Sequence, residues 1–308
     1  MSTIEKAMGE LRHTSPKSNA AEALKSSADV LSGAESQPAV TKIEGKKEPF
    51  KDSSRIIPIN NSLLESLGMI NNGSNESERQ IKDEFRLIKH KLLKKAFTPE
   101  EGHKPSANKR NLIMVSSPNM NEGKTFVSIN LALSIASEQD KTVLLIDADV
   151  LSPSIGDTLG FDNDMPGLTD YLLGNVGDLS DIIYPTTVPD FRVMPAGSSN
   201  NMSYELLSSG KMAALMEEIA SRYSDRIILL DCPPLLGVVE TVTLSNLVGQ
   251  AIVVVEQNKT KLGDIKQAVA LLNSEIDTGF VINKAVQTAG HGYGYGYGYG
   301  YGSKDNKK

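Results

Sequence analysis

Residues 116–136, SSPNMNEGKTFVSINLALSIA, decide the fold of this chain. They continue an apolar run at 111–116 that is typical of a buried strand, and they lead through a polar turn into an apolar stretch with helical spacing. Gly123, Lys124 and Thr125 stand at that turn, which is the arrangement of a P-loop. In a P-loop, backbone N–H groups cradle phosphates, the lysine neutralises phosphate oxygens and the hydroxyl binds Mg²⁺. The alternative is a Gly-Lys pair that starts a helix by chance.

The loop departs from the usual GxxxxGK[ST] pattern at one position. Pro118 stands where the first glycine is expected, and it lacks a backbone N–H. Asn121 follows in the loop, and asparagine is the residue after glycine that best tolerates a positive φ. We therefore expect Asn121 to adopt the conformation that a glycine would otherwise supply.

Short apolar runs alternate with helical stretches from residue 110 onward, which predicts a mostly parallel sheet with helices on both faces. This is the α/β architecture of a P-loop NTPase. The predicted strands are 111–116, 142–147, 191–195, 226–231, 251–255 and 279–283, and the predicted helices are 124–138, 204–223, 239–248 and 262–274.

The chain divides into four parts by composition. Residues 1–53 are polar and charged, and we expect them to be disordered because they have too little apolar surface to bury. Residues 54–79 predict a linker with a short docking segment, and residues 80–285 the P-loop domain, which opens on an amphipathic helix. Residues 286–308 predict a flexible tail that carries a tyrosine cluster.

Composition excludes several classes of protein. The chain has 38 acidic and 32 basic residues and a net charge of −6, which does not favour nucleic-acid binding through phosphate neutralisation. Cys232 is the only cysteine, so disulfides and cysteine-based metal sites within one chain are excluded. No apolar run approaches the roughly 20 residues that span a bilayer. We therefore expect a cytoplasmic protein.

Carboxylates follow two of the predicted strands. Asp147 and Asp149 come at the end of VLLIDAD, and Asp231 comes at the end of RIILLD. The carboxyl edge of a parallel sheet is where open α/β folds bind ligands, so these side chains and the P-loop predict the surroundings of a nucleotide-bound Mg²⁺ ion. The alternative is that the three carboxylates are unrelated loop caps.

Tyrosine alternates strictly with glycine near the end of the chain. The five tyrosines are Tyr293, Tyr295, Tyr297, Tyr299 and Tyr301. In an extended chain, all five rings would lie on one face. Such a low-complexity tract is typical of an interaction tag, and it also offers five phenolic hydroxyl groups that could be modified.

Three stretches, 116–136, 143–154 (VLLIDADVLSPS) and 227–234 (IILLDCPP), together resemble the bacterial tyrosine kinases of exopolysaccharide systems. DEFRLIKHKLL, GLTDYLLG, MPAG and YELLSS further resemble the autokinases of exosortase-type operons. The resemblance covers about 54–302. It implies ATP and Mg²⁺ as cofactors and autophosphorylation, in a neighbouring subunit, of the tyrosine cluster. It also implies a membrane chain-length regulator of polysaccharide export, or co-polymerase, as a partner that supplies an activating cytoplasmic segment and recruits the chain to the inner membrane.

The same resemblance assigns roles to individual residues. Asp147 would orient or deprotonate the acceptor tyrosine, and Lys124 and Asp149 complete the catalytic group. Thr125, Asp149 and Asp231 would hold the metal. The ATP and phosphate contacts would come from Asn121, Glu122, Gly123, Lys124, Thr125, Phe126 and Asn283. Asn283 is equally well explained as an ordinary residue at a strand end.

Asp83, Arg86 and Lys89 match the Glu-x-x-Arg-x-x-Arg helix by which such kinases assemble into rings. Here only Arg86 retains a guanidinium for bidentate pairing, and the alternative is a solvated helix face. The family's Arg-x-Pro after the acidic pair is Leu-Ser-Pro at 151–153, so a cationic contact is missing.

A partition or division-site ATPase, with the tail as an interaction tag only, is the alternative function. Those ATPases carry an additional lysine five positions before the P-loop lysine, and here that position is Asn119.

Overall fold

The computed structural model describes residues 55–70, 76–97, 109–199, 203–222 and 225–286, all of which belong to the compact unit Phe50–Lys308. The sequence predictions for the N-terminal 53 residues and for the five tail tyrosines lie outside the described residues. No helix among those ranges is long and apolar enough to cross a membrane.

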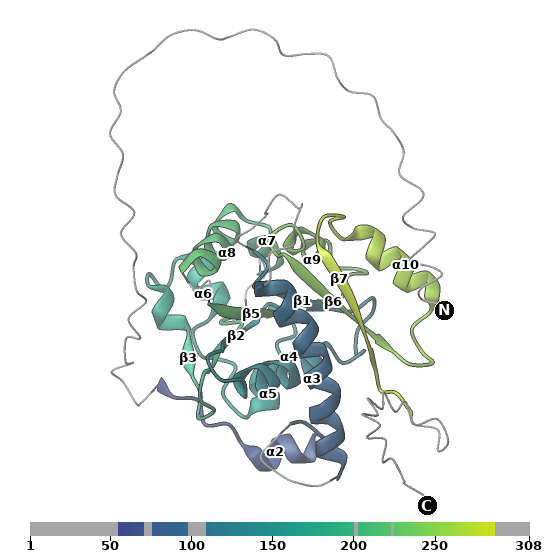
Figure 1. Ribbon diagram of the computed structural model, residues 1–308. Coiled ribbons are helices and arrows are strands. Elements are labelled where there is room, and N and C mark those ends of the chain that lie inside the picture. Colours follow the sequence, from purple (N-terminus) through teal and green to yellow (C-terminus); the bar gives the residue numbers. More distant parts are fainter. Residues whose placement is uncertain (1–54, 71–75, 98–108, 200–202, 223–224, 287–308) are drawn as a thin grey trace, which may run out of the picture. The chain divides into compact units, whose positions relative to one another are not determined.

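A seven-stranded sheet forms the centre of the domain, in the order β3-β4-β2-β5-β1-β6-β7 (Figure 1). All neighbouring pairs are parallel except β3 and β4, which are antiparallel. The strands are β1 (Leu112–Ser116), β2 (Thr142–Asp147), β3 (Tyr184–Pro185), β4 (Phe191–Met194), β5 (Arg226–Asp231), β6 (Gln250–Glu256) and β7 (Asp277–Asn283). The central strands β1, β2 and β5 are buried on both faces, which explains their unbroken apolar sequences.

Helices cover both faces of the sheet. One face packs against α2 (Asn61–Ser66), α3 (Glu76–Phe97), α4 (Lys124–Ala136) and α5 (Ile155–Leu159). The other face packs against α6 (Leu168–Leu173), α7 (Ser203–Leu207), α8 (Gly210–Arg222), α9 (Val239–Leu244) and α10 (Leu262–Leu271), and the 3-10 helix η2 (Leu179–Ile182) joins the same cluster. Successive residues of β5 alternate between the two clusters, with Ile227 and Leu229 in one and Ile228 and Leu230 in the other.

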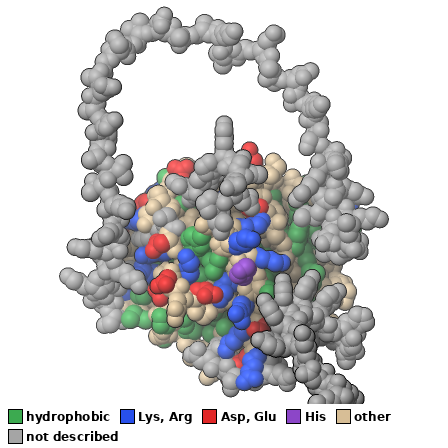
Figure 2. Space-filling view, viewed as in Figure 1, with side chains coloured by type: hydrophobic (Ala, Val, Ile, Leu, Met, Phe, Trp, Pro, Cys, Tyr) green, Lys and Arg blue, Asp and Glu red, His purple; other side chains and the backbone are tan. Residues whose placement is uncertain are grey.

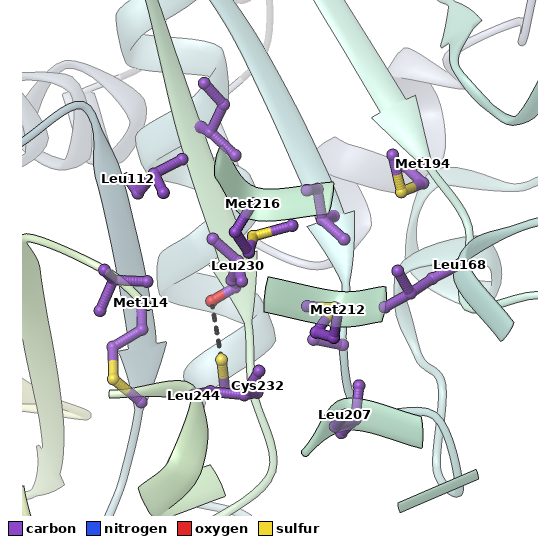
Figure 3. Packing of buried hydrophobic residues seen from close by; sticks show 14 of the residues in the cluster. Leu112, Met114, Leu168, Met194, Leu207, Met212, Met216, Leu230, Cys232 and Leu244 are labelled. Carbon is purple, nitrogen blue, oxygen red and sulfur yellow. Dashed lines mark hydrogen bonds between the residues drawn. The ribbon is translucent and has the colours of Figure 1, made fainter. Parts of the chain in front are cut away.

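Figure 3 shows the second of these clusters, in which methionine and leucine side chains fill the space between the sheet and α7, α8 and α9. Cys232 is completely buried there, and its thiol donates a hydrogen bond to the Leu230 carbonyl at 3.5 Å. Burial raises the pKa of this thiol well above its ordinary value. Cys232 is therefore a packing residue.

The docking segment expected within 54–79 is part of the domain core. Ile57 forms a parallel bridge with Thr186, and its N–H donates to the Pro185 carbonyl at 2.8 Å. Ile57, Leu64 and Met69 are all buried in the cluster that contains α4. Residues 55–70 thus complete the β3 side of the sheet.

The predicted strands agree with the observed ones to within two residues, but two predictions need correction. The helix expected at 204–223 is two helices, because the Ser209 hydroxyl accepts a hydrogen bond from the Met212 N–H and starts α8 after a break at 208–209. The short edge strand β3 was not predicted, because two residues carry no alternating pattern.

Candidate active site

The connection between β1 and α4 has the conformation that a phosphate-binding loop requires. Asn121 has φ 62° and Gly123 has φ 94°, so both residues are left-handed, as predicted for Asn121. Gly123 caps α4, and Lys124 is its first helical residue. A Cβ atom on Gly123 would lie 2.0 Å from Nδ2 of Asn283, so only glycine fits there.

Residues at the ends of β7 and β6 hold the loop in place. Asn283 closes β7, and its side-chain amide donates to the Glu122 carbonyl at 2.9 Å. The next residue, Lys284, donates from Nζ to the Asn121 carbonyl at 2.8 Å and to a Glu256 carboxylate oxygen at 3.0 Å. Asn283 therefore supports the loop through the donor group of its amide, and its predicted contact with ATP stays a prediction.

A pocket of about 470 Å³ opens beside this loop. Its volume is within the range of small-molecule sites. It is lined by Met120, Asn121, Gly123, Lys124, Thr125, Asp149, Ser152, Ser154 and Pro234. Five of the predicted site residues thus meet in one pocket. Met120, Ser152, Ser154 and Pro234 were not predicted, although Pro234 stands in the quoted IILLDCPP stretch and the serines stand in VLLIDADVLSPS.

Lys124 and Asp149 face each other across the pocket. Nζ of Lys124 lies 3.8 Å from Oδ2 of Asp149, and both side chains are largely buried. Burial raises the pKa of Asp149, and the Lys124 ammonium and a backbone N–H partly oppose that rise. The pocket therefore presents one cation and one carboxylate close together beside the P-loop.

The Thr125 hydroxyl lies 2.8 Å from the Ser154 hydroxyl, which places the expected metal-binding hydroxyl against the segment that follows β2. The Ser154 N–H and the Ile155 N–H both donate to Oδ2 of Asp147, at 3.3 and 3.2 Å. Oδ1 of Asp147 accepts from the Asp149 N–H at 3.2 Å. Asp147 thus organises the segment from 149 to 155 and is only 1% exposed.

Asp147 and Asp231 are partners across the ladder between β2 and β5. Burial, together with the charges of Asp231 and Asp149, raises the pKa of Asp147 well above its ordinary value. Burial also raises the pKa of Asp231 to about 6, although the Thr125 hydroxyl and the Lys124 ammonium partly oppose it. Asp231 accepts a hydrogen bond on Oδ1 from the Ser128 hydroxyl at 3.0 Å. Within the described residues, its buried Oδ2 makes no hydrogen bond.

Two other predicted phosphate-site residues do not line the pocket. The Phe126 ring points to α3, where it packs against Phe85 with ring centroids 6.4 Å apart. The Glu122 carboxylate is 2% exposed and is bonded within the protein. Either residue can contact a phosphate only through its backbone N–H.

The predicted assembly residues lie on different sides of α3. Asp83 and Arg86 are exposed. Lys89 is buried, with Nζ 3.0 Å from the Ser134 carbonyl and 2.7 Å from a Glu138 carboxylate oxygen, so it fastens α3 to α4 within one chain. The Lys89 ammonium lowers the pKa of Glu138. Figure 2 shows Lys and Arg side chains gathered along α3, and the C-terminal half of this helix carries no acidic residue after Glu84.

The AAA domain family (AAA_31) matches residues 112–285. Tyrosine-protein kinase ptk of Acinetobacter johnsonii is 35% identical over 161 residues, which cover 52% of this chain and 21% of that relative. The chain therefore spans about a fifth of the length of the first curated relatives it matches. Tyrosine-protein kinase CpsD of Streptococcus agalactiae serotype Ia is 30% identical over 185 residues, which cover 59% of this chain and 78% of CpsD.

Among solved structures, the VpsO kinase domain superposes with a TM-score of 0.56 at 28% identity, covering 69% of this chain and 100% of that domain. The chain thus shares the fold of that kinase domain. The chain belongs to the AAA domain family and, within it, to the bacterial tyrosine-protein kinases.

Proposed function

We propose that this chain is an ATP-dependent protein-tyrosine autokinase that phosphorylates the C-terminal tyrosine cluster of a neighbouring copy and thereby regulates exopolysaccharide polymerisation and export. The observation that carries the proposal is the pocket in which Lys124 and Asp149 face each other at 3.8 Å beside the P-loop. Phosphoryl transfer requires positioning and charge neutralisation more than covalent chemistry from the protein, and this pocket provides both.

The residues of the pocket fit a nucleotide with Mg²⁺. The buried Oδ2 of Asp231, which has no hydrogen-bond partner among the described residues, is suited to a metal-bound water. The described residues contain no group of three or more His, Cys, Asp or Glu side chains that could hold a metal ion alone. Mg²⁺ characteristically keeps several waters and takes nucleotide phosphate oxygens as ligands, so Thr125, Asp149 and Asp231 suffice as the protein's share.

Each residue then has a defined task. The N–H groups of the first turn of α4 have no partner within the helix, and together with those of the loop they would bind the phosphates. Lys124 neutralises charge on the transferred group. Bound ATP with Mg²⁺ supplies the phosphoryl group and an additional positive charge at the phosphates.

The acceptor tyrosine must lose its phenolic proton as the new O–P bond forms. A tyrosine has a pKa of about 10, so a nearby carboxylate that takes the proton assists the attack. Asp149 lines the pocket, which supports a direct contact between its carboxylate and the phenol in this proposal. Asp147, the candidate from sequence, accepts the N–H groups of Asp149, Ser154 and Ile155 and so would position the segment that carries Asp149.

Assembly and partners complete the proposal. Asp83 and Arg86 on the exposed face of α3 would contact a neighbouring copy, while Lys89 holds that helix in position. A membrane chain-length regulator would supply the activating cytoplasmic segment and recruit the chain to the inner membrane. Several phosphates on one tail, at about −1.5 to −2 charge each, would repel one another and favour disassembly.

The decisive experiment uses the full chain with ATP and Mg²⁺, with and without the cytoplasmic segment of the membrane partner, followed by mass mapping of phosphotyrosine. An isotope-labelled Lys124→Met chain is mixed with the unlabelled wild type. We expect phosphate on the labelled tail at 293–301, which only a neighbouring copy can place there. Lys91→Met, at an exposed position of α3, is the matched control and should retain activity.

The competing function is a switch ATPase whose tail is an interaction tag. In that class, the residue at position 119 is a lysine that reaches across a dimer. Here the Asn119 amide donates instead to Glu122 and Asp264 of its own chain, at 3.3 and 3.1 Å. ATP hydrolysis with an unmodified tail, in the presence of the partner segment, would support the switch ATPase and refute the kinase.

A further inference from the structure

Glu122 presents a physical problem within the phosphate-binding loop. It precedes Gly123 and Lys124, and its carboxylate is buried to 2% exposure. A fixed negative charge beside a site for polyphosphate opposes binding by repulsion unless the charge is directed away and compensated. The contacts of this side chain show how that is done.

Three donors converge on the Glu122 carboxylate. Oε2 accepts from the Asn119 backbone N–H at 3.0 Å, and Oε1 accepts from the Thr260 hydroxyl at 2.6 Å and from the Asn119 amide at 3.3 Å. Hydrogen bonds to a charged acceptor are stronger than neutral ones. Glu122 is therefore held from its own loop on one side and from the connection between β6 and α10 on the other.

The Thr260 side is itself anchored. The Thr260 hydroxyl accepts from the Glu256 N–H at 2.8 Å, which fixes it at the end of β6. The Asn119 amide also donates to the Asp264 carboxylate, in the first turn of α10, at 3.1 Å. The Glu122 carboxylate thus fastens the P-loop to the connection that follows β6.

The contacts of Glu122 with Asn119 and Thr260, here called the brace, change which backbone N–H groups remain to bind phosphate. Pro118 has no N–H, and the Asn119 N–H is used by Glu122. The donors that remain for phosphates come from the segment after Asn119, above all from Gly123 and the first turn of α4. The brace also holds the loop in register at the place where the usual first glycine is missing.

We propose that Glu122 is a positioning residue for nucleotide binding, which acts through Asn119 and Thr260 and does not itself contact the phosphates through its side chain. The proposal rests on the nucleotide-binding part of the proposed function and not on tyrosine as the acceptor. It predicts that removing a negative charge from the phosphate loop weakens nucleotide binding, the reverse of what simple charge repulsion predicts.

The test is the affinity for Mg-ADP, measured by calorimetry, which needs no kinase activity. We expect Glu122→Ala to weaken binding about tenfold, which corresponds to roughly 1.4 kcal/mol. Glu122→Gln keeps one acceptor oxygen and the side-chain length, and it should recover most of the affinity. Glu275→Ala removes an exposed carboxylate that is remote in sequence from the loop, and it should leave affinity unchanged.

Thr260 supplies an independent test from the other end of the contact. Thr260→Val removes the hydroxyl at nearly constant volume and should weaken binding several-fold, whereas Thr260→Ser should behave as wild type. The double variant Glu122→Ala with Thr260→Val should bind no more weakly than Glu122→Ala alone, because both changes break one brace. If tyrosine phosphorylation is measurable, KM for ATP should rise while kcat at saturating ATP stays within about twofold.

Three results would overturn the inference. The first is Mg-ADP binding by Glu122→Ala as tight as, or tighter than, wild type, which would mean that the carboxylate only repels phosphate. The second is additive effects in the double variant. The third is a Glu122→Gln variant as impaired as Glu122→Ala. Melting temperatures of all variants identify any that fail to fold. If Glu122→Ala fails to fold, the Mg-ADP affinities of Thr260→Val and Thr260→Ser are compared instead. A protein that binds Mg-ADP as predicted but never phosphorylates tyrosine would refute the kinase and leave this inference standing.

Discussion

Replacing Asp231 by asparagine should stabilise the nucleotide-free protein while it destroys the site. Asp231 is completely buried, and burial raises its pKa from an ordinary 3.8 to about 6. A raised carboxyl pKa means that the folded state holds its proton more tightly than the unfolded state does. The stability contributed by the protonated form is therefore fully present below pH 3.8 and is lost as the pH rises through about 6.

The magnitude follows from the size of the shift. The pKa of Asp231 is roughly two units higher in the folded than in the unfolded state. Its ionisation therefore lowers the free energy of unfolding by about 3 kcal/mol at pH 7.5 but by only about 1 kcal/mol at pH 4.5. An asparagine side chain at this position would be neutral at both pH values and would still accept from the Ser128 hydroxyl through its amide oxygen. The Asp231→Asn variant should therefore exceed the wild type in free energy of unfolding by an amount that grows with pH.

Urea unfolding at pH 4.5 and 7.5, followed by circular dichroism because the chain has no tryptophan, measures this difference. EDTA and the absence of nucleotide keep the site free of metal. Asp225→Asn is the matched control, because Asp225 stands just before the same strand with a side chain that is 81% exposed. A variant less stable than wild type at pH 7.5, or a difference that does not change with pH, would refute the reasoning. Added Mg-ADP should stabilise the wild type more than the variant.

Three further predictions concern the loop and α3. Gly123→Ala should lower both Mg-ADP affinity and the melting temperature, because the added Cβ collides with Asn283. Gly237 has a similar positive φ of 100° but open space around it, so Gly237→Ala should lower the free energy of unfolding only by the backbone strain of about 1 kcal/mol. If calorimetry showed equal losses of Mg-ADP affinity for Gly123→Ala and Gly237→Ala, the steric argument would be contradicted. Lys89→Met should destabilise the monomer by about 1 kcal/mol in urea unfolding, because it removes a buried ammonium that donates to the Ser134 carbonyl and pairs with Glu138; the Ser134 carbonyl keeps the Ser137 hydroxyl as a donor. Arg86→Ala should change unfolding by less than about 0.5 kcal/mol and should lower the assembly mass in light scattering, and an unchanged mass would count against an interface on this face.

The sheet and the P-loop were predictable because their signals are local. Buried parallel strands read as short apolar runs, and Gly123-Lys124-Thr125 follows one such run directly. The left-handed conformation of Asn121 also followed from the steric preferences of one residue type. Asp149 lines the same pocket as the P-loop for a similar reason, since parallel strands end at one edge of the sheet.

The partners of individual side chains could not be predicted, because they depend on contacts between segments far apart in the chain. Nothing in the sequence pairs Glu122 with Thr260, which lies 138 residues away. Lys89 looked like a surface cation at helical spacing, and only the packing of α3 on α4 shows that it is buried. The relative access of Asp147 and Asp149 was equally hidden, because it depends on the turn that Asp147 itself holds together.

The contact of Lys284 with the Asn121 carbonyl means that the chain leaves the described domain beside its own P-loop. Tyr293 follows nine residues later, a span of at most about 30 Å when extended. A flexible chain of that length would keep an attached group at a local concentration on the order of millimolar near the pocket, however dilute the protein is. A phosphate on Tyr293 would therefore compete with the phosphates of the nucleotide for the pocket. The number of residues between Lys284 and Tyr293 would set how strongly it competes.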